Sequence, residues 1–338
     1  MSKPIASSPW ATCQELSGSL VGLAARRNRP ARRLCGRSWR GRLLTWLAGK
    51  WQDGFGPRGT QAVGILMYHR ITDEIPGVPA PTWNVPPARF AAQLEGLLAR
   101  GWRAWPLEQV IDYHRRGQPI PRRTFVVTFD DGYANNLYQA LPILRRLAVP
   151  ATVFLATAYL DGRDPLPFDD WEAAGSTQVP QEAWRPLTTT ECQQLVASGL
   201  VTLGAHTHTH GDFRGQPHRL RSDLARCLAV LRERFFLESP PMALPYGTLA
   251  DGFASQELLV AAEEAGVSCC LTTEPRLVLP GQSLFGWGRR GVEADDTAAT
   301  LAGWLGGWET ALREAIAAPV RLARRWQTAP FAVQASRG

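Results

Sequence analysis

From about residue 62 onward, the sequence alternates short runs of β-branched and aromatic residues with segments of helical periodicity. This alternation is typical of βα units built around a parallel sheet. The expected strands are Val63–Tyr68, Thr124–Asp130, Ala151–Thr157, Leu200–Ala205, Met242–Tyr246 and Val267–Thr272, with short pieces near Arg103 and Val292. We therefore predict an α/β fold, a distorted (β/α) barrel of about seven strands, with an open parallel sheet as the alternative.

The segments between the expected strands carry helix signals. A helix is predicted from about Pro87. Another is predicted over 137–147, where leucines recur at helical spacing. A third opens at the capping box Thr188-x-x-Glu191 and ends at Gly199. Two more are predicted within 220–235 and 253–265. Residues 158–187 have no clear period and are predicted to form a long surface loop of the kind that often carries function.

The charge is unevenly distributed along the chain. Of the net +7, residues 1–60 contribute +9, from eleven Lys or Arg against Glu15 and Asp53, so the rest carries −2. A near-neutral body argues against a nucleic-acid partner. The basic arm is predicted to be solvated, with weak contact to an anionic membrane surface as the alternative. We expect three parts: this arm at 1–60, partly disordered or helical, an α/β domain at 61–295, and a helical segment and tail at 296–338.

Three further features of the chain limit where it works and how it is held together. No apolar run is long enough to span a membrane and no convincing signal peptide is present, which favours a cytoplasmic protein or one peripheral to the membrane. The six cysteines form no C-x-x-C pair and are expected to be mostly buried thiols. Near the C-terminus, Leu301, Trp304, Trp308 and Leu312 fall near helical spacing and are predicted to pack against the barrel.

Polar and titratable residues follow the expected strands at their carboxyl ends, where a barrel of this kind has its active site. They are His69, Asp130, Asp131, His206, His208, His210 and Tyr246. Asp130 and Asp131 end an apolar strand, and two adjacent carboxylates there are costly unless a cation compensates their charge. Neighbours on a strand face opposite ways, so one carboxylate could bind a metal while the other addresses a water. The alternative is a helix cap with Gly132 in the turn.

The run 206–210 holds three of the six histidines of the chain. Imidazole nitrogens together with carboxylate oxygens suit zinc and related divalent ions. The histidines must be neutral to bind a metal, which also removes their mutual repulsion. We therefore predict one bound divalent ion, with zinc as the expected metal.

These motifs resemble those of the polysaccharide deacetylases, the NodB homology domain of carbohydrate esterase family 4. Thr128-Phe-Asp-Asp-Gly132 is similar to the first motif and His206-Thr-x-x-His210 to the second. Pro245-Tyr-Gly247 resembles the third motif, in the branch with an Ala-x-Pro-Tyr-Gly pattern, and Leu66-Met-Tyr-His69 resembles one frequent start of the domain. The resemblance covers roughly residues 61–295 and implies a NodB-like barrel.

The resemblance also implies roles for individual residues. Asp130 would be the general base, and Asp131, His206 and His210 would be the protein ligands of the metal. The backbone N–H of Tyr246 would meet the developing oxyanion. His208 falls on a variable position between the ligands and is left out of the ligand set.

The sequence departs from the family pattern at two positions. An Arg that often supports the catalytic Asp is replaced by Ala243, and we predict that Arg289 takes its place, with Arg290 as second candidate. The late histidine that often supplies a general acid is missing, since no histidine follows His218. His69 could be that acid, but we expect it rather to brace a metal ligand.

The predicted function is therefore metal-dependent hydrolysis of an N-acetyl group on a sugar of a polysaccharide or lipid-linked glycan. A near alternative keeps the chemistry and removes an O-acetyl or formyl group. From other classes, the chain could be a carbohydrate-binding protein that has lost turnover on the same fold, or a membrane-surface or partner-binding protein. The intact Asp130, Asp131, His206 and His210 favour the enzyme.

Overall fold

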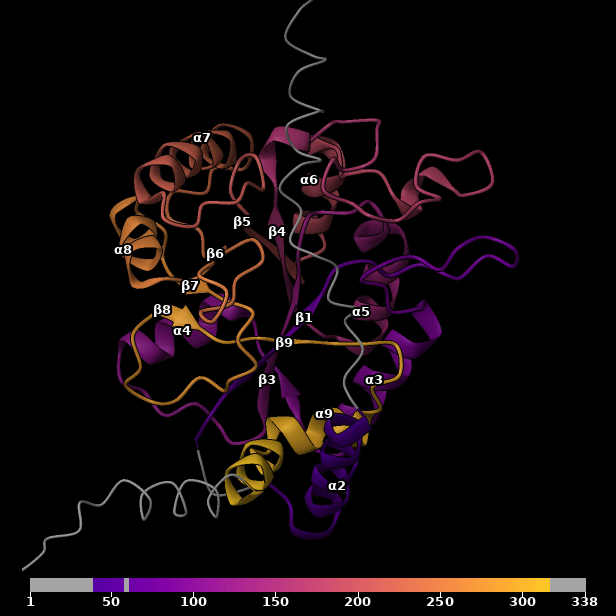
Figure 1. Ribbon diagram of the computed structural model, residues 1–338, viewed down its shortest axis with the longest axis vertical. Helices are drawn as coiled ribbons and strands as arrows, with labels where there is room; N and C mark the ends of the chain where they lie inside the picture. The colour runs from indigo at the N-terminus through magenta and orange to yellow at the C-terminus, as the bar shows by residue number, and fades with distance from the viewer. Residues whose placement is uncertain (1–38, 58–60, 317–338) are drawn as a thin grey trace, which may run out of the picture.

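The computed structural model describes residues 39–57 and 61–316 (Figure 1). The strands of this part are β1 (Gly64–Tyr68), β2 (Arg103–Ala104), β3 (Thr124–Phe129), β4 (Ala151–Leu155), β5 (Val201–Ala205), β6 (Met242–Ala243), β7 (Cys270–Leu271), β8 (Phe285–Trp287) and β9 (Arg290–Gly291). They form one sheet in the order β8-β7-β6-β5-β4-β3-β1-β9, with β2 beside the start of β3. Every strand pairing in the sheet is parallel.

The sheet curls into a distorted barrel. β8 and β9 stand at opposite ends of the strand order, yet only residues 288 and 289 separate them in the chain. Three steps of extended chain span roughly 10 Å at most, so the two edges of the sheet come close together. The predicted barrel is confirmed, although the described residues hold nine strands instead of about seven, and β8 was not predicted.

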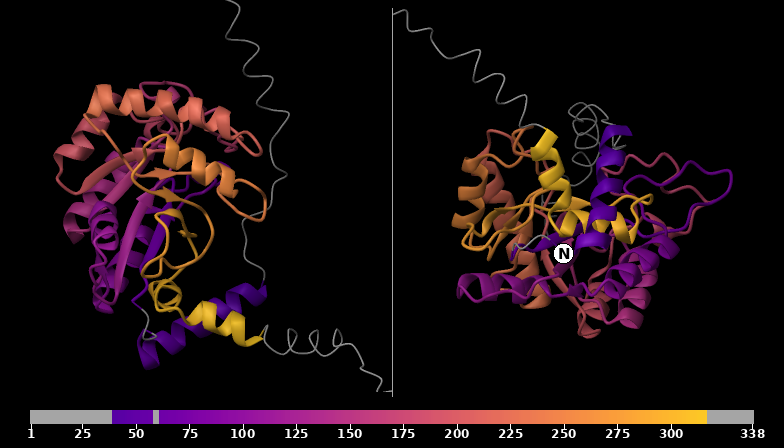
Figure 2. Two further views of the ribbon diagram at one scale, coloured as in Figure 1. Left: turned by 90° about the vertical axis from the view of Figure 1, so that its left-hand side faces the viewer. Right: turned by 90° about the horizontal axis from the view of Figure 1, so that it is seen from below.

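Helices cover the outside of the curled sheet (Figures 1 and 2). They are α3 (Pro87–Ala99), α5 (Leu141–Leu147), α6 (Thr189–Ala197), α7 (Pro217–Phe235) and α8 (Gln256–Glu264). α4 (Leu107–Arg115) instead packs its apolar side chains against the residues inside the barrel. The capping box predicted at Thr188 is present at the start of α6. The predicted helix over 137–147 begins with a π-helical turn, Asn136–Ala140, before α5. α4 was not predicted.

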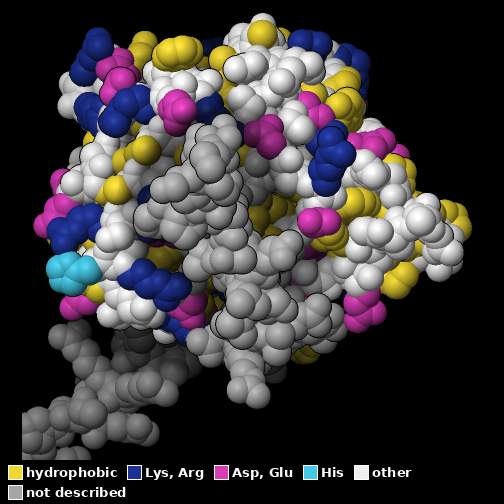
Figure 3. Space-filling view, turned by 90° about the horizontal axis from the view of Figure 1, so that it is seen from above, with side chains coloured by type: hydrophobic (Ala, Val, Ile, Leu, Met, Phe, Trp, Pro, Cys, Tyr) yellow, Lys and Arg dark blue, Asp and Glu magenta, His cyan; other side chains and the backbone are white. Residues whose placement is uncertain are grey.

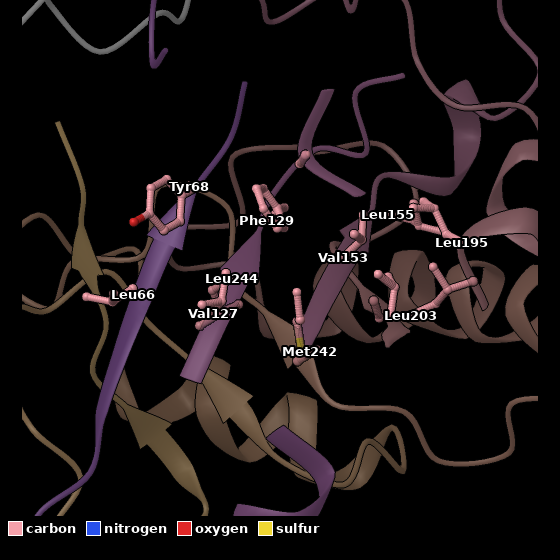
Figure 4. Close-up of a cluster of buried hydrophobic side chains, with 14 of the residues drawn as sticks. Leu66, Tyr68, Val127, Phe129, Val153, Leu155, Leu195, Leu203, Met242 and Leu244 are labelled. Carbon is pink, nitrogen blue, oxygen red and sulfur yellow. The ribbon is translucent and has the colours of Figure 1, made fainter. Parts of the chain in front are cut away.

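Alternation along the strands separates two hydrophobic clusters. One face of the sheet packs against the helices through alternate residues such as Leu66, Val127 and Val153, which lie among the side chains of Figure 4. The intervening residues, among them Ile65 and Phe154, fill the inside of the barrel with side chains of α4. Residues that continue the inward series beyond a strand therefore reach the rim of the barrel.

The register aligns the carboxyl ends of the central strands. Tyr68, the last residue of β1, pairs with Phe129, the last residue of β3. Asp130 extends the ladder, since its backbone N–H donates to the Tyr68 carbonyl at 2.9 Å. His206 does the same after β5, donating from its backbone N–H to Leu155 of β4 at 2.9 Å. Asp130 and His206 thus emerge on the same rim.

At the opposite end of the strands, α2 (Trp39–Phe55) packs against α9 (Ala298–Leu305), the lower pair in Figure 1. α9 contacts the start of β1 closely, because a Cβ on Gly64 would lie 2.2 Å from Leu305. Trp304 is buried, as predicted, whereas the Trp308 ring lies 5.3 Å from that of Trp51 on α2. The three-part division of the chain stays a prediction.

Two smaller expectations concern cysteines and membrane spans. Cys192, Cys227, Cys269 and Cys270 are free and buried, as predicted, and Cys13 and Cys35 lie outside the described residues. Within 39–57 and 61–316, no helix has both the length and the apolar character that crossing a membrane requires.

Candidate active site

Arg289 lies inside the barrel between the two edges of the sheet and binds Asp130. Its guanidinium donates to both carboxylate oxygens of Asp130, at 2.6 Å and 2.8 Å. It also donates to the carbonyl of Thr272 at 3.2 Å and the hydroxyl of Thr128 at 3.3 Å. Both charged groups are almost completely buried. Arg290, the second candidate, does not reach Asp130 and binds Asp296 and Glu309 instead.

The Arg289–Asp130 pair sets the charge of the carboxyl group. Burial by itself raises the pKa of Asp130, but the charge and hydrogen bonds of Arg289, with a contribution from His206, lower it below its usual value. Asp130 is therefore ionised at neutral pH. An ionised carboxylate can accept a proton from a water molecule beside it.

Asp131, His206 and His210 form a separate group next to Asp130. The Nε2 atoms of His206 and His210 each lie 3.3 Å from Oδ1 of Asp131. The ligand atoms of the three residues lie within 4.8 Å of one another, and all three side chains are buried. Nε2 of His206 also lies 4.0 Å from Oδ2 of the other carboxylate, Asp130.

This group has the donor set of a divalent cation site. Oδ1 of Asp131 is buried and lacks a hydrogen-bond partner in the described structure. Nδ1 of His206 lies 2.8 Å from the Ala243 carbonyl, to which it can only donate, so a neutral His206 directs the lone pair of Nε2 toward Asp131. Two imidazole nitrogens and an anionic oxygen fit zinc and related ions.

The loops after the strands hold these residues in restricted conformations. Asp131, His210 and Tyr246 all have left-handed backbones, with φ of 71°, 52° and 63°. Non-glycine residues in this region are uncommon and concentrate at functional sites. Gly132 also has a positive φ, of 78°, and a Cβ there would lie 2.7 Å from the end of the Leu155 side chain, so this turn favours glycine.

Asp223 of α7 organises the loop that carries the histidines, and the sequence analysis missed it. Its carboxylate accepts from the backbone N–H groups of His208 and Thr209, at 2.5 Å and 3.3 Å, and from the Thr209 hydroxyl at 2.5 Å. Asp223 lies on the buried face of α7, one turn from Leu220. A charged residue within an apolar stripe was the signal available in the sequence.

The remaining predicted residues lie around this group. The Tyr246 ring is 5.0 Å from that of His210 and partly exposed. His69 follows β1 on the rim, and burial lowers its pKa. Its imidazole makes no hydrogen bond to a predicted ligand within the described residues, so the bracing role stays a prediction. His208 turns away and lies 3.0 Å from the Thr157 hydroxyl.

The loop 158–187 closes over one side of the site. Phe168 stacks on the His210 ring, with centroids 3.7 Å apart and planes inclined by 17°. A buried ion pair between Arg70, directly after His69, and Asp169 fastens the loop to the end of β1. Neither contact could be predicted, because the loop has no periodicity that would fix which side chains turn inward.

Comparisons with known proteins agree with this geometry. Residues 117–269 match the family model for polysaccharide deacetylases. YxkH of Bacillus subtilis (strain 168), which carries the name of a polysaccharide deacetylase, is 22% identical over 222 residues, 65% of this chain and 68% of that protein. The poly-beta-1,6-N-acetyl-D-glucosamine N-deacetylase of Escherichia coli (strain K12) is 24% identical over 57% of this chain, which spans only 32% of that protein.

Solved structures share the fold. IcaB from Ammonifex degensii superposes with a TM-score of 0.60 at 24% identity, over 72% of this chain and 97% of that one. The family match covers residues 117–269, which include Asp130, Asp131, His206 and His210. Together with the shared fold, this match confirms the resemblance to the polysaccharide deacetylases that the motifs predicted.

Proposed function

We propose that this chain removes the acetyl group from an N-acetylated sugar of a glycan, releasing acetate and leaving a free amine. The observation that carries the proposal is the pairing of two buried carboxylates with different partners. Asp130 is bound by Arg289, whereas the neighbouring Asp131 faces His206 and His210. One carboxylate is thus free to hold a proton while the other belongs to a ligand set.

Asp131, His206 and His210 would hold the metal ion. When bound, a divalent ion supplies Lewis acidity to a carbonyl group and lowers the pKa of water. The buried, unpartnered Oδ1 of Asp131 supports this assignment. Zinc is the metal that this donor set fits best.

Asp130 would act as the general base. It accepts a proton from water as the water oxygen bonds to the acetyl carbon, and the backbone N–H of Tyr246 stabilises the negative charge that develops on the carbonyl oxygen. The carbon–nitrogen bond then breaks, and the proton passes to the departing amine. His69 on the rim is the candidate that could assist this transfer, although its lowered pKa favours a neutral imidazole at rest.

The relatives suggest the class of glycan. Two of them, from Escherichia coli and Staphylococcus epidermidis, are named for poly-beta-1,6-N-acetyl-D-glucosamine. We extend this to N-acetylglucosamine polymers as the first substrates to test for this chain. Removal of an O-acetyl or formyl group by the same residues is the nearest alternative, and glycan binding without turnover is the alternative from another class.

The test measures metal content and acetate release together on a panel of oligomers. Protein purified with stoichiometric metal should release acetate from β-1,6-linked N-acetylglucosamine oligomers. A chelator should abolish the release, and added zinc should restore it. Acetate release only from O-acetylated sugars would favour the esterase. Oligomer binding without any release would favour the binding protein.

We also propose weak contact of the N-terminal arm with an anionic membrane surface. On α2, Trp39, Leu43 and Trp46 are exposed and fall on one face of the helix, with Arg42 and Lys50 close by. Such a combination of aromatic and basic side chains suits the interface of a membrane. Replacing the three exposed residues with Ser should reduce cosedimentation with vesicles that contain phosphatidylglycerol. Unchanged binding would remove α2 from the contact.

A further inference from the structure

Trp83 is an exposed aromatic side chain on the rim that the proposed chemistry does not use. Its ring lies 5.4 Å from the imidazole of His69, with the planes inclined by 33°. At the same time 54% of the residue is exposed. His69 directly follows β1, whose last residue pairs with the residue before Asp130. Trp83 thus stands one side chain away from the rim residues of the candidate site.

The backbone of Trp83 is strained. Its φ is 51°, in the left-handed region, which a bulky side chain rarely adopts. Conformations of this kind persist only where the surroundings enforce them, and they concentrate at ligand-binding positions. The strained backbone conformation therefore indicates that the exposed side chain of Trp83 has a function.

Hydrogen bonds on both sides of Trp83 enforce this conformation. The Arg70 backbone N–H donates to the Trp83 carbonyl at 3.2 Å, and the Arg70 guanidinium donates to the Thr82 carbonyl at 2.9 Å. On the other side, the Asn84 side chain accepts from the backbone N–H of Thr72 at 3.0 Å and donates to its carbonyl at 2.9 Å. The same Arg70 is paired with buried Asp169. The ring is therefore presented to solvent by a rigid support.

We propose that Trp83 is a stacking platform for a sugar ring of the glycan chain, adjacent to the sugar whose acetyl group is removed. The inference rests on the proposed function and specifies its substrate as an oligosaccharide or polysaccharide. One face of a pyranose ring carries mainly C–H groups, and this apolar face packs on a flat aromatic ring while the hydroxyls stay hydrated. A pre-positioned ring loses little conformational entropy on binding, so the contact contributes directly to affinity.

The test compares binding of a β-1,6-linked N-acetylglucosamine pentamer and of the monosaccharide by calorimetry. The background is Asp130→Asn, in which the pentamer is expected to persist unhydrolysed. Adding Trp83→Ala should weaken pentamer binding about 10-fold, the scale of one aromatic contact, while monosaccharide binding stays the same. Trp83→Phe should recover part of the affinity. Trp39→Ala, at the opposite end of the molecule, is the matched control and should have no effect.

In otherwise wild-type protein, Trp83→Ala should raise KM for the pentamer with kcat within about twofold. A merely structural role would instead lower kcat for every substrate and weaken the monosaccharide as well. Equal pentamer affinity with and without Trp83 would overturn the platform while leaving the proposed deacetylation intact. If the Asp130→Asn protein, which retains Trp83, binds neither sugar, the proposed substrate class is wrong. The proposed role of Trp83 is then wrong as well.

Discussion

The inside of the barrel and the layer outside it each contain a buried arginine, and the two are neighbours in the chain. Arg289 is bound to a single carboxylate, Asp130, at the rim where the candidate site lies. Arg290 points the other way and binds Asp296 and Glu309, two carboxylates near the ends of α9. Arg289 directly precedes β9 and Arg290 is its first residue, so alternation along the extended chain turns the two side chains in opposite directions.

The two arginines teach that burial and ion pairing alone do not mark a functional residue. Both are almost completely buried, and both lie against an aromatic ring, Phe154 for Arg289 and Trp304 for Arg290. What distinguishes Arg289 is that its partner stands beside the Asp131, His206 and His210 group. Arg290 instead fastens the segment after the barrel to the sheet. The first should therefore control activity and the second stability.

The largest loss of activity is expected when a residue of the Asp131, His206 and His210 group is replaced. His210→Ala removes one of the three proposed metal ligands, so the purified protein should contain no stoichiometric metal and its activity should fall to background. Elemental analysis of the purified protein checks this, with His208→Ala as matched control because His208 turns away from the group. Stoichiometric metal in His210→Ala would show that the ligand assignment is wrong.

Arg289→Ala should lower activity at neutral pH by a factor of roughly 10². With Arg289 present, the pKa of Asp130 is below its usual value, so the base is ionised from mildly acidic pH upward. Without Arg289, burial acts against a weaker opposing charge and the pKa of Asp130 rises, so a smaller fraction of the base is ionised at neutral pH and the fraction grows as the pH rises. The pH–rate profile of the variant should therefore shift to higher pH and recover part of the activity.

The control for Arg289→Ala is the same profile for Arg290→Ala, whose acidic limb should match the wild type. A profile that shifts for Arg290→Ala and not for Arg289→Ala would contradict the comparison. If neither variant changes the profile, Asp130 does not depend on an arginine for its charge.

The smallest effect on activity is expected for Arg290→Ala. This substitution should instead lower the free energy of unfolding. Removing one partner of a buried ion pair costs about 3–5 kcal/mol. Asp296 would remain buried without its guanidinium partner, whereas Glu309 would keep its ion pair with Arg313. Urea denaturation should show a lower midpoint, while turnover per folded molecule stays near that of the wild type. Unchanged stability would mean that the outer pair does not hold the C-terminal segment.

The sequence was sufficient for the main strands and for the rim. β1, β3, β4 and β5 have five or six residues each, enough to give a clear run of buried positions, and Asp130 and His206 follow such runs. β8 and β9 have three and two residues, too few for any periodic pattern. α4 is amphipathic, with Leu107, Val110 and Ile111 buried on one face, but the only element predicted between residues 101 and 124 was the short strand near Arg103.

Long-range partners are the other part that the sequence alone could not supply. Arg289 was favoured over Arg290 only by resemblance and position, since both precede the expected strand near Val292. The choice depends on which of the two side chains faces inward, and a shift of one residue in register reverses that. The contact of Phe168 with His210 depends on a loop whose conformation is set by a distant ion pair.

The most direct test of the central claim, that Asp130 is the base beside a separate metal group, is turnover of the Asp130→Asn protein after its metal content has been confirmed. The amide is nearly isosteric and leaves Asp131, His206 and His210 in place, but it cannot accept the proton from water. The account predicts stoichiometric metal and a kcat lower by a factor of roughly 10² or more on the pentamer. A kcat near that of the wild type in the metal-loaded variant would contradict it and place the base elsewhere.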